Sequence, residues 1–305
     1  MMFALWPRVT FLRRCFLASS KAKLTIAFVA VIEIGFRDRF LNVITDPNVA
    51  YILMMLGMLG LFFELSNPGA ILPGVVGGIW AGRQAGHENV ITLDVGGTSA
   101  DIGLAQGGKL RMKHLLDTKV GPYQAMIPMV DVDTIGAGGG SIAYVDQGGI
   151  FNVGPRSAGA DPGPAAYGRG GTEPTATDAM VVLGWLRPEA FLGGGMELQP
   201  DLARRAFEEG PAEALGMSVE EAAMGAVQIL THSMVQSIEE NSVRKGFDPR
   251  DFALVAFGGA GPMHANAVAR IMGSFPVVIP PAPGLLCATG DLVADFRDEF
   301  ARTFI

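Results

Sequence analysis

The sequence predicts an α/β protein that is preceded by a membrane-associated helical segment. Short β-branched runs separated by glycine turns occupy residues 89–153, and helical patterns follow from residue 201 onward. An apolar run at residues 49–63 precedes both patterns. We therefore predict a basic and apolar region at residues 1–80 and a globular α/β domain at residues 81–305.

The composition indicates a folded protein whose partners are small molecules. Of the residues, 49% are hydrophobic and 17% are charged, which is enough to form a sizeable core. The net charge is -7, and residues 1–46 are basic, so the remaining body is acidic and excludes nucleic acid as a partner. Cys15 and Cys287 lie far apart, so we expect neither a disulfide framework nor a zinc site, and a reducing cytoplasm is the expected compartment.

The apolar run VAYILMMLGMLGLFF is a candidate membrane segment. It is shorter than the roughly 20 residues that span a bilayer core, so a spanning helix, a re-entrant segment and a buried helix all stay open. The tract at residues 36–80, with NPGAILPG directly after the apolar run, resembles the membrane region of NfeD-like proteins. This resemblance implies an integral membrane segment, and the basic N-terminal residues are compatible with a cytoplasmic N-terminus. We therefore expect membrane association with a cytoplasmic catalytic domain; a wholly cytoplasmic protein is the alternative.

The globular part begins with β-strands and ends with helices. Three strands should form an antiparallel meander, and two more should flank the turn at residues 147–149. Ser218 and Glu221 form a capping box for a helix that runs to about residue 245, where Gly246 ends it. The expected strands are 89–94, 102–105, 109–113, 141–145, 150–153 and 252–257, and the other expected helices are 201–215 and 264–272.

The motif LDVGGTSAD at residues 93–101 is a candidate phosphate loop at a hairpin. Its glycines let backbone amides converge on an anion, its hydroxyls add donors, and its two aspartates could hold a hydrated Mg²⁺. A structural Gly-Gly hairpin explains the same residues. The motif is neither a Walker A loop nor GxGxxG opening a helix. It resembles the hairpin of the actin, sugar-kinase and heat-shock-chaperone ATPase superfamily, which implies an actin-like, RNase H-like lobe that binds ATP.

A second glycine loop, FGGAGP at residues 257–262, lies between a buried strand and the helix that contains His264. Its glycines permit close packing of an adenine or ribose, and the helix start offers free amides. A tight strand-to-helix turn is the structural alternative.

Between these loops the sequence resembles a known family. DVGGTSAD, VDTIGAGGGSIA, GPRSAGADPGPAAYGRGG, TEPTATDA, FLGGGM, RDFALVAFGGAGPMHA and IPPAPGLLCATGDLVAD occur in the order found in the hydantoinase A/oxoprolinase family. The resemblance implies ATP-dependent opening of a cyclic amide by phosphoryl transfer, with ATP and Mg²⁺ as cofactors and a hydantoinase B-type subunit as partner. Related carboxylase subunits act on acetone or acetophenone, so a small ketone is the alternative substrate.

The resemblance implies a set of site residues. The Gly138–Ser141 segment could be a second backbone nest or a flexible turn. For Asp178 and His264 a structural cap, a salt bridge or a surface position is the alternative to catalysis. The expected nucleotide-binding residues are Asp94, Gly96, Gly97, Thr98, Ser99, Gly138, Gly139, Gly140, Ser141, Gly258, Gly259, Gly261 and Pro262. The expected catalytic residues are Asp94, Asp101, Asp178 and His264, and the expected metal ligands are Asp94 and Asp101.

The chain departs from the family pattern at its ends. The family has a further N-terminal lobe with its own DxGGT-type loop and continues beyond the position of Ile305, so we expect a truncated domain with half of its nucleotide cleft. We therefore expect no ring-opening activity from this chain alone. The segment PGVVGGI at residues 73–79 resembles both the NfeD-like turn and the segment before the family's phosphate strand. A non-enzymatic, membrane-associated fusion remnant is the rival interpretation.

Overall fold

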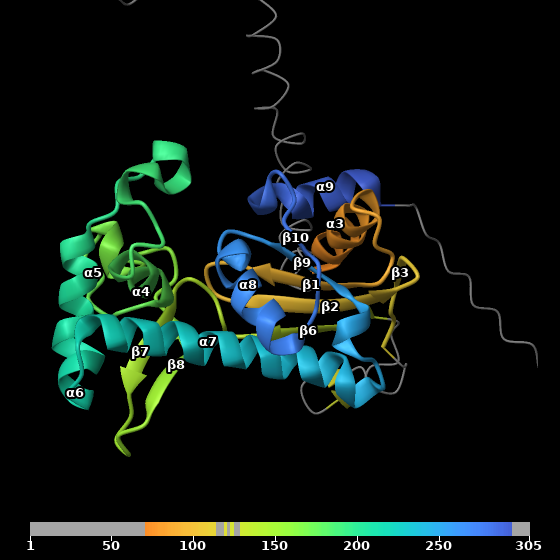
Figure 1. Cartoon of the computed structure of the whole chain (residues 1–305). Helices are drawn as coiled ribbons and strands as arrows, with labels where there is room; N and C mark the ends of the chain where they lie inside the picture. The colour runs from red at the N-terminus through yellow and green to blue at the C-terminus, as the bar shows by residue number, and fades with distance from the viewer. Residues whose placement is uncertain (1–70, 114–118, 121–122, 125–128, 295–305) are drawn as a thin grey trace, which may run out of the picture. The chain divides into compact units, whose positions relative to one another are not determined.

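The computed structural model describes residues 71–113, 119–120, 123–124 and 129–294 of the chain (Figure 1). The described residues belong to one compact unit. Its centre is a mixed β-sheet with helices on both faces, which confirms the predicted α/β class.

The sheet has an antiparallel half and a parallel half. Its strands lie in the order β10-β9-β1-β2-β3, and β6 also pairs with β2. The central strands β1 and β9 are almost wholly buried, as expected for strands that helices cover on both faces. This order agrees with the RNase H-like lobe that the sequence resemblance implies. The bounds are β1 (Val90–Val95), β2 (Ala100–Gln106), β3 (Lys109–Leu110), β6 (Val132–Ile135), β9 (Ala253–Phe257) and β10 (Val277–Val278).

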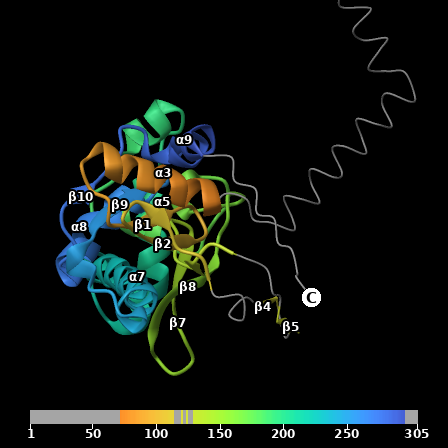
Figure 2. The same cartoon turned by 90° about the vertical axis from the view of Figure 1, so that its right-hand side faces the viewer.

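Two pairs of helices cover the sheet. Helices α3 (Ile71–Gln84) and α9 (Leu286–Val293) lie on one face, while α7 (Val219–Asn241) and α8 (Gly261–Met272) lie on the other (Figures 1 and 2). Helix α7 begins at the predicted capping box, in which the Ser218 side chain accepts from the Glu221 amide and the Glu221 side chain accepts from the Ser218 amide. The chain leaves the following turn through Gly246, whose φ is +85°.

The N-terminal half of α7 carries a second group of elements. A hairpin and several short helices pack there around Met180, Phe207 and Ala226. The predicted helix at residues 201–215 is interrupted at Gly210, directly before Pro211, where the backbone leaves helical geometry. These elements are β7 (Ser141–Val145), β8 (Phe151–Ser157), α4 (Ala176–Val182), α5 (Pro200–Phe207), η3 (Glu208–Ala212) and α6 (Glu213–Leu215). The remaining short elements are β4 (Lys119–Val120), β5 (Tyr123–Gln124), η1 (Ala165–Tyr167), η2 (Pro188–Gly194), η4 (Val243–Lys245), η5 (Pro249–Asp251) and η6 (Pro283–Leu285).

The glycine-rich segment at residues 73–79 belongs to the sheet-covering helix α3. Val75 and Ile79 are buried against the sheet, and a Cβ added to Gly78 would overlap the side chain of Thr92. The predicted assignment of these residues to a membrane segment is therefore wrong, and the expected boundary between residues 80 and 81 falls inside α3. The apolar run at residues 49–63 lies outside the described residues. Within the described ranges, no helix has both the length and the apolar character to cross a bilayer.

Candidate functional site

The turn at residues 96–99 joins β1 to β2 and presents free backbone donors. The Gly96 amide closes the turn by donating to the Ser99 carbonyl at 2.9 Å. In the described part of the chain, the amides of Gly97, Thr98 and Ser99 donate to no other group. The Thr98 hydroxyl lies at the same tip, 3.4 Å from the hydroxyl of Ser157 on β8. The turn thus has free donors on consecutive residues, and their binding of phosphate stays a prediction.

Hydrogen bonds from the Gly138–Ser141 segment fix the direction of those donors. The Gly139 amide donates to the Gly96 carbonyl at 3.0 Å, and the Gly140 amide donates to the Gly97 carbonyl at 2.6 Å. A carbonyl and the next N–H of a trans peptide point in opposite directions. The N–H groups of Gly97 and Thr98 therefore point away from this segment, as adjacent donors do in an anion-binding nest.

The Gly138–Ser141 segment itself has no amide left for a ligand. The Gly138 amide donates to the Ser141 hydroxyl at 2.8 Å, the Ser141 amide donates to the Gly138 carbonyl at 3.0 Å, and the other two amides hold the hairpin. The predicted phosphate nest at these four residues is therefore wrong. Their glycines serve close approach instead, because a Cβ on Gly138 would lie 2.6 Å from the Thr98 nitrogen.

Helix α4 anchors this segment in turn. The amide and the hydroxyl of Thr177 both donate to the Gly139 carbonyl, each at 2.8 Å. The next residue, Asp178, is fully buried, and its carboxylate accepts from the amides of Ala165, Ala166 and Thr175 and from the Thr175 hydroxyl. Burial raises the pKa of Asp178, and these hydrogen bonds lower it in part. The predicted catalytic role of Asp178 does not fit, because Oδ2 caps α4 and accepts from the Ala165 amide, while Oδ1 accepts from the Ala166 amide.

Asp94 and Asp101 face each other across the hairpin. They are directly opposite in the β1–β2 register, so their side chains lie on the same face of the sheet. Thr134 donates to Asp101 Oδ1 at 2.5 Å, and the Cys287 thiol donates to Asp94 Oδ2 at 3.2 Å. Among the described residues, the second oxygen of each carboxylate has no hydrogen-bond partner.

The electrostatic environment of this pair is negative and partly desolvated. Burial raises the pKa of both carboxyls, and the charge of Asp101 raises that of Asp94 further. Burial and the neighbouring Asp94 raise the pKa of the Cys287 thiol to about 12, so it is a donor at neutral pH. The described residues contain no group of three or more His, Cys, Asp or Glu that could hold a metal. A pair of carboxylates nevertheless fits Mg²⁺, which binds through one or two carboxylates together with phosphate oxygens and water.

The FGGAGP loop supports the hairpin from the β9 side. The Ala260 amide donates to the Val95 carbonyl at 2.9 Å. Gly258 has a φ of +80°, and an added Cβ would overlap Asp94 Oδ1. Gly259 faces open space, and α8 begins at Gly261 with Pro262 in its first turn. The loop thus lies beside the carboxylates, and its contact with a nucleoside stays a prediction.

His264 does not belong to this site. It is fully buried on the face of α8 that carries Val268 and Ala269, and neither ring nitrogen has a hydrogen-bond partner in the described part of the chain. Burial lowers its pKa to about 4, so the imidazole is neutral at pH 7. The predicted catalytic role is wrong in this structure, because an enclosed imidazole cannot touch a substrate.

A core role for His264 predicts a specific pH dependence of stability. The folded pKa of about 4 lies below the ordinary value of 6.5, so this contribution to stability is complete above pH 6.5 and is lost as the pH falls to 4. We expect the free energy of unfolding to fall by up to roughly 3 kcal/mol over this window. His264→Leu should remove that component and leave stability at pH 7 equal or higher, because no hydrogen bond is lost. Urea denaturation at several pH values measures this, with the exposed His232→Gln as control.

Comparison with known proteins identifies relatives of this arrangement. Residues 62–300 match the hydantoinase/oxoprolinase family. The chain is 47% identical over 226 residues to the caprolactamase subunit alpha of Pseudomonas jessenii. This matched region covers 74% of this chain and 32% of that protein. It is 40% identical over 238 residues to the acetophenone carboxylase gamma subunit of Aromatoleum aromaticum. The matched region here covers 77% of this chain and 32% of that protein. The chain thus spans about a third of the length of these relatives.

Solved structures give the same relationship. The nucleotide-free structure of acetone carboxylase, an enzyme of ATP-dependent acetone carboxylation, matches with a TM-score of 0.69 at 32% identity, over 74% of this chain and 32% of that chain. The ATP-dependent caprolactamase of Pseudomonas jessenii matches with a TM-score of 0.68 at 46% identity, over 73% of this chain and 32% of that chain. The family match begins inside the tract at residues 36–80, and no comparison supports the NfeD-like resemblance.

The structure also brings residues to the site that sequence reasoning missed. Thr134, Thr177 and Cys287 each donate to the hairpin or to the segment that holds it. All three lie in quoted motifs, VDTIGAGGGSIA, TEPTATDA and IPPAPGLLCATGDLVAD. A polar side chain beside a glycine-rich segment was the available signal, but only the fold shows which partner it meets.

Proposed function

Because this chain belongs to the hydantoinase/oxoprolinase family, we propose that it provides the phosphate-binding part of an ATP-dependent hydrolase that activates a cyclic amide by phosphoryl transfer. One observation carries the proposal: the outward-pointing amides of Gly97 and Thr98 stand beside the facing carboxylates of Asp94 and Asp101. Donors for phosphate oxygens and ligands for a cation are thereby brought together on one hairpin.

Each group of the hairpin has a role in this proposal. The amides of Gly97 and Thr98 and the hydroxyl of Thr98 bind phosphate oxygens. Asp94 Oδ1 and Asp101 Oδ2 hold Mg²⁺ directly or through water, and the cation neutralises charge on the phosphates when it is bound. Because Gly139 and Gly140 fix the carbonyls behind the Gly97 and Thr98 amides, these donors need little reorganisation when phosphate binds.

The substrate class follows from the relatives. Caprolactamase, at 47% identity, is named for a cyclic amide, and the carboxylase relatives are named for ketones. We favour a small cyclic amide as substrate, with a ketone as the second candidate. Both contain a carbonyl oxygen that a phosphoryl group can turn into a leaving group, in the ketone through its enol. Since these relatives are enzyme subunits, we propose a hydantoinase B-type subunit as partner.

Calorimetry with Mg-ADP tests the proposed nucleotide site. We expect Asp94→Ala to weaken binding about tenfold or more, which corresponds to about 1.4 kcal/mol. Thr98→Val should weaken it about three- to tenfold, since it removes one hydroxyl donor and keeps the β-branched shape. Asp201→Ala on the remote helix α5 is the matched control. Unchanged affinity in both hairpin variants, with native circular dichroism, would exclude the hairpin as the phosphate site.

A further inference from the structure

The two facing carboxylates of the hairpin are held by neutral donors only. In the described ranges no Lys, Arg or His forms an ion pair with Asp94 or Asp101, although both are partly buried. Two partly buried carboxylates without a cationic partner leave a local excess of negative charge, which a bound cation would balance. A neutral donor orients a carboxylate without cancelling the charge that attracts the cation.

We propose that Cys287 and Thr134 are positioning residues for a divalent cation, each fixing one oxygen of a carboxylate and leaving the other oxygen to the cation. Cys287 Sγ donates to Asp94 Oδ2 at 3.2 Å, and Thr134 Oγ1 donates to Asp101 Oδ1 at 2.5 Å. The inference rests on the proposed function, because it takes this hairpin as the site of the cation.

The packing of α9 on α3 determines where the Cys287 thiol lies. A Cβ on Gly77 would lie 2.5 Å from the Leu286 carbonyl oxygen, so the two helices touch backbone to backbone beside Cys287. At Gly74, one turn earlier on α3, an added Cβ would lie 3.2 Å from Asp94 Oδ2 and 3.4 Å from Cys287 Sγ. The thiol and the carboxylate oxygen therefore meet against the α3 backbone, which limits the rotation of both side chains.

The position of Thr134 is set by strand register. Thr134 on β6 is directly opposite Asp101 on β2, which is directly opposite Asp94 on β1. These three side chains form one cross-strand row on the same face of the sheet. Thr134 at one end of the row fixes an oxygen of Asp101, and Cys287 on the covering helix α9 fixes an oxygen of Asp94 at the other end.

Mn²⁺ binding to the full-length chain tests this inference. The free Mn²⁺ signal in electron paramagnetic resonance gives its affinity in the presence of saturating ADP. We expect Cys287→Ala and Thr134→Val each to weaken Mn²⁺ binding about tenfold, the lower end of the effect of losing a group that orients a ligand. Cys287→Ser and Thr134→Ser should restore the affinity to within about threefold, since each keeps a donor.

Two further measurements separate the possible outcomes. ADP binding in EDTA and the melting temperature are measured for Cys287→Ala and Cys287→Ser; equal losses of both in the two variants would show a merely structural role and overturn the proposal, whereas a loss of Mn²⁺ affinity that serine restores supports it. If Asp94→Ala weakens Mn²⁺ binding but Cys287→Ala and Thr134→Val do not, the positioning role is wrong and the proposed function stands. If Asp94→Ala and Asp101→Ala also leave Mn²⁺ and ADP binding unchanged, the proposed function itself fails.

Discussion

Alanine at position 138 is expected to abolish nucleotide binding while the protein stays folded. The added Cβ would lie 2.6 Å from the Thr98 nitrogen and 2.7 Å from the carbonyl carbons of Gly97 and Thr98. All three are backbone atoms, so the turn at residues 96–99 must move and its amides must move with it. Misplacing several phosphate donors at once should lower Mg-ADP affinity at least 100-fold, or about 2.7 kcal/mol.

Gly138→Ala should lower the free energy of unfolding by too little to unfold the protein. Overpacking of this kind costs about 1–3 kcal/mol, and the hairpin tip has room to shift outward because Gly97 and Thr98 are exposed. Calorimetry measures the affinity, and urea denaturation measures the stability. Gly284→Ala is the matched control, since its Cβ would enter open space. Native affinity in Gly138→Ala would show that the Gly138–Ser141 segment does not set the geometry of the turn.

The hairpin could be predicted from the sequence because its determinants are local. Two apolar β-branched strands with a Gly-Gly turn between them specify their own register, and the structure confirms both strands to within about two residues. The capping box at Ser218 is local in the same sense. A turn with free backbone donors can therefore be predicted before the fold is known.

The function of the Gly138–Ser141 segment could not be predicted in this way. Richness in glycine indicates close approach of the backbone, but it does not tell whether the amides are free or used. Here they are used, because the carbonyls of Gly96 and Gly97, some forty residues earlier, accept from them. A long-range contact of this kind leaves no periodic signal in the sequence.

Burial is the second reason for the failed predictions. Asp178 and His264 are chemically versatile residues next to glycine-rich motifs, but the core encloses both of them. The prediction of a membrane segment at residues 73–79, which lie in α3, failed for a related reason. An apolar, glycine-rich segment has the same composition whether a bilayer or a β-sheet covers it, and only the contact of Gly78 with Thr92 decides for the sheet.

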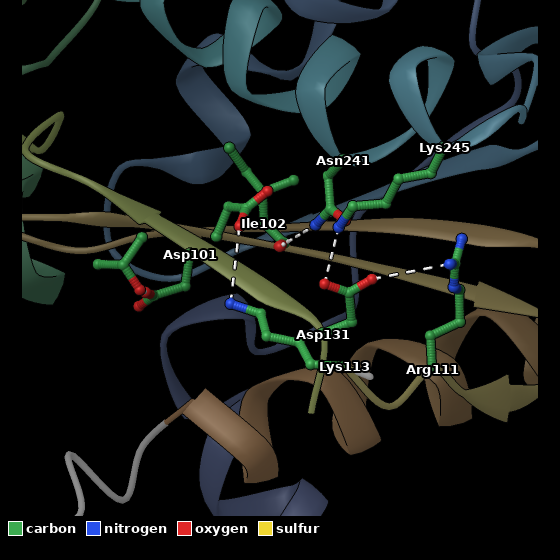
Figure 3. A network of polar contacts seen from close by, with 9 residues as sticks. Asp101, Ile102, Arg111, Lys113, Asp131, Asn241 and Lys245 are labelled. Carbon is green, nitrogen blue, oxygen red and sulfur yellow. Dashed lines mark hydrogen bonds and ion pairs between the residues drawn. The ribbon is translucent and has the colours of Figure 1, made fainter. Parts of the chain in front are cut away.

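A partly buried ion pair ties η4, directly after α7, to the residue before β6 on the sheet. Asp131 is 5% exposed, and Lys245 Nζ donates to it at 2.7 Å and to Asn241 Oδ1 at 2.6 Å (Figure 3). Asn241 Nδ2 in turn donates to the carbonyl of Ile102 at 2.9 Å, next to Asp101 on β2. Arg111 is a weaker partner of Asp131, at 3.8 Å.

Lys245→Met is therefore expected to lower the free energy of unfolding by about 2 kcal/mol, between the values for an exposed and for a buried pair, because Lys245 is partly exposed and Arg111 still faces Asp131. The loss should arise from Asp131, which keeps its charge without its nearest cation. Adding Asp131→Leu should then recover at least half of the loss, because it removes that charge. Urea denaturation provides the measurement.

The neighbouring exposed pair, Arg244 with Glu240 at 3.2 Å, is the control, and Arg244→Met should cost under about 1 kcal/mol. Equal losses for Lys245→Met and Arg244→Met, or additive losses in the double variant, would show that Asp131 does not depend on Lys245.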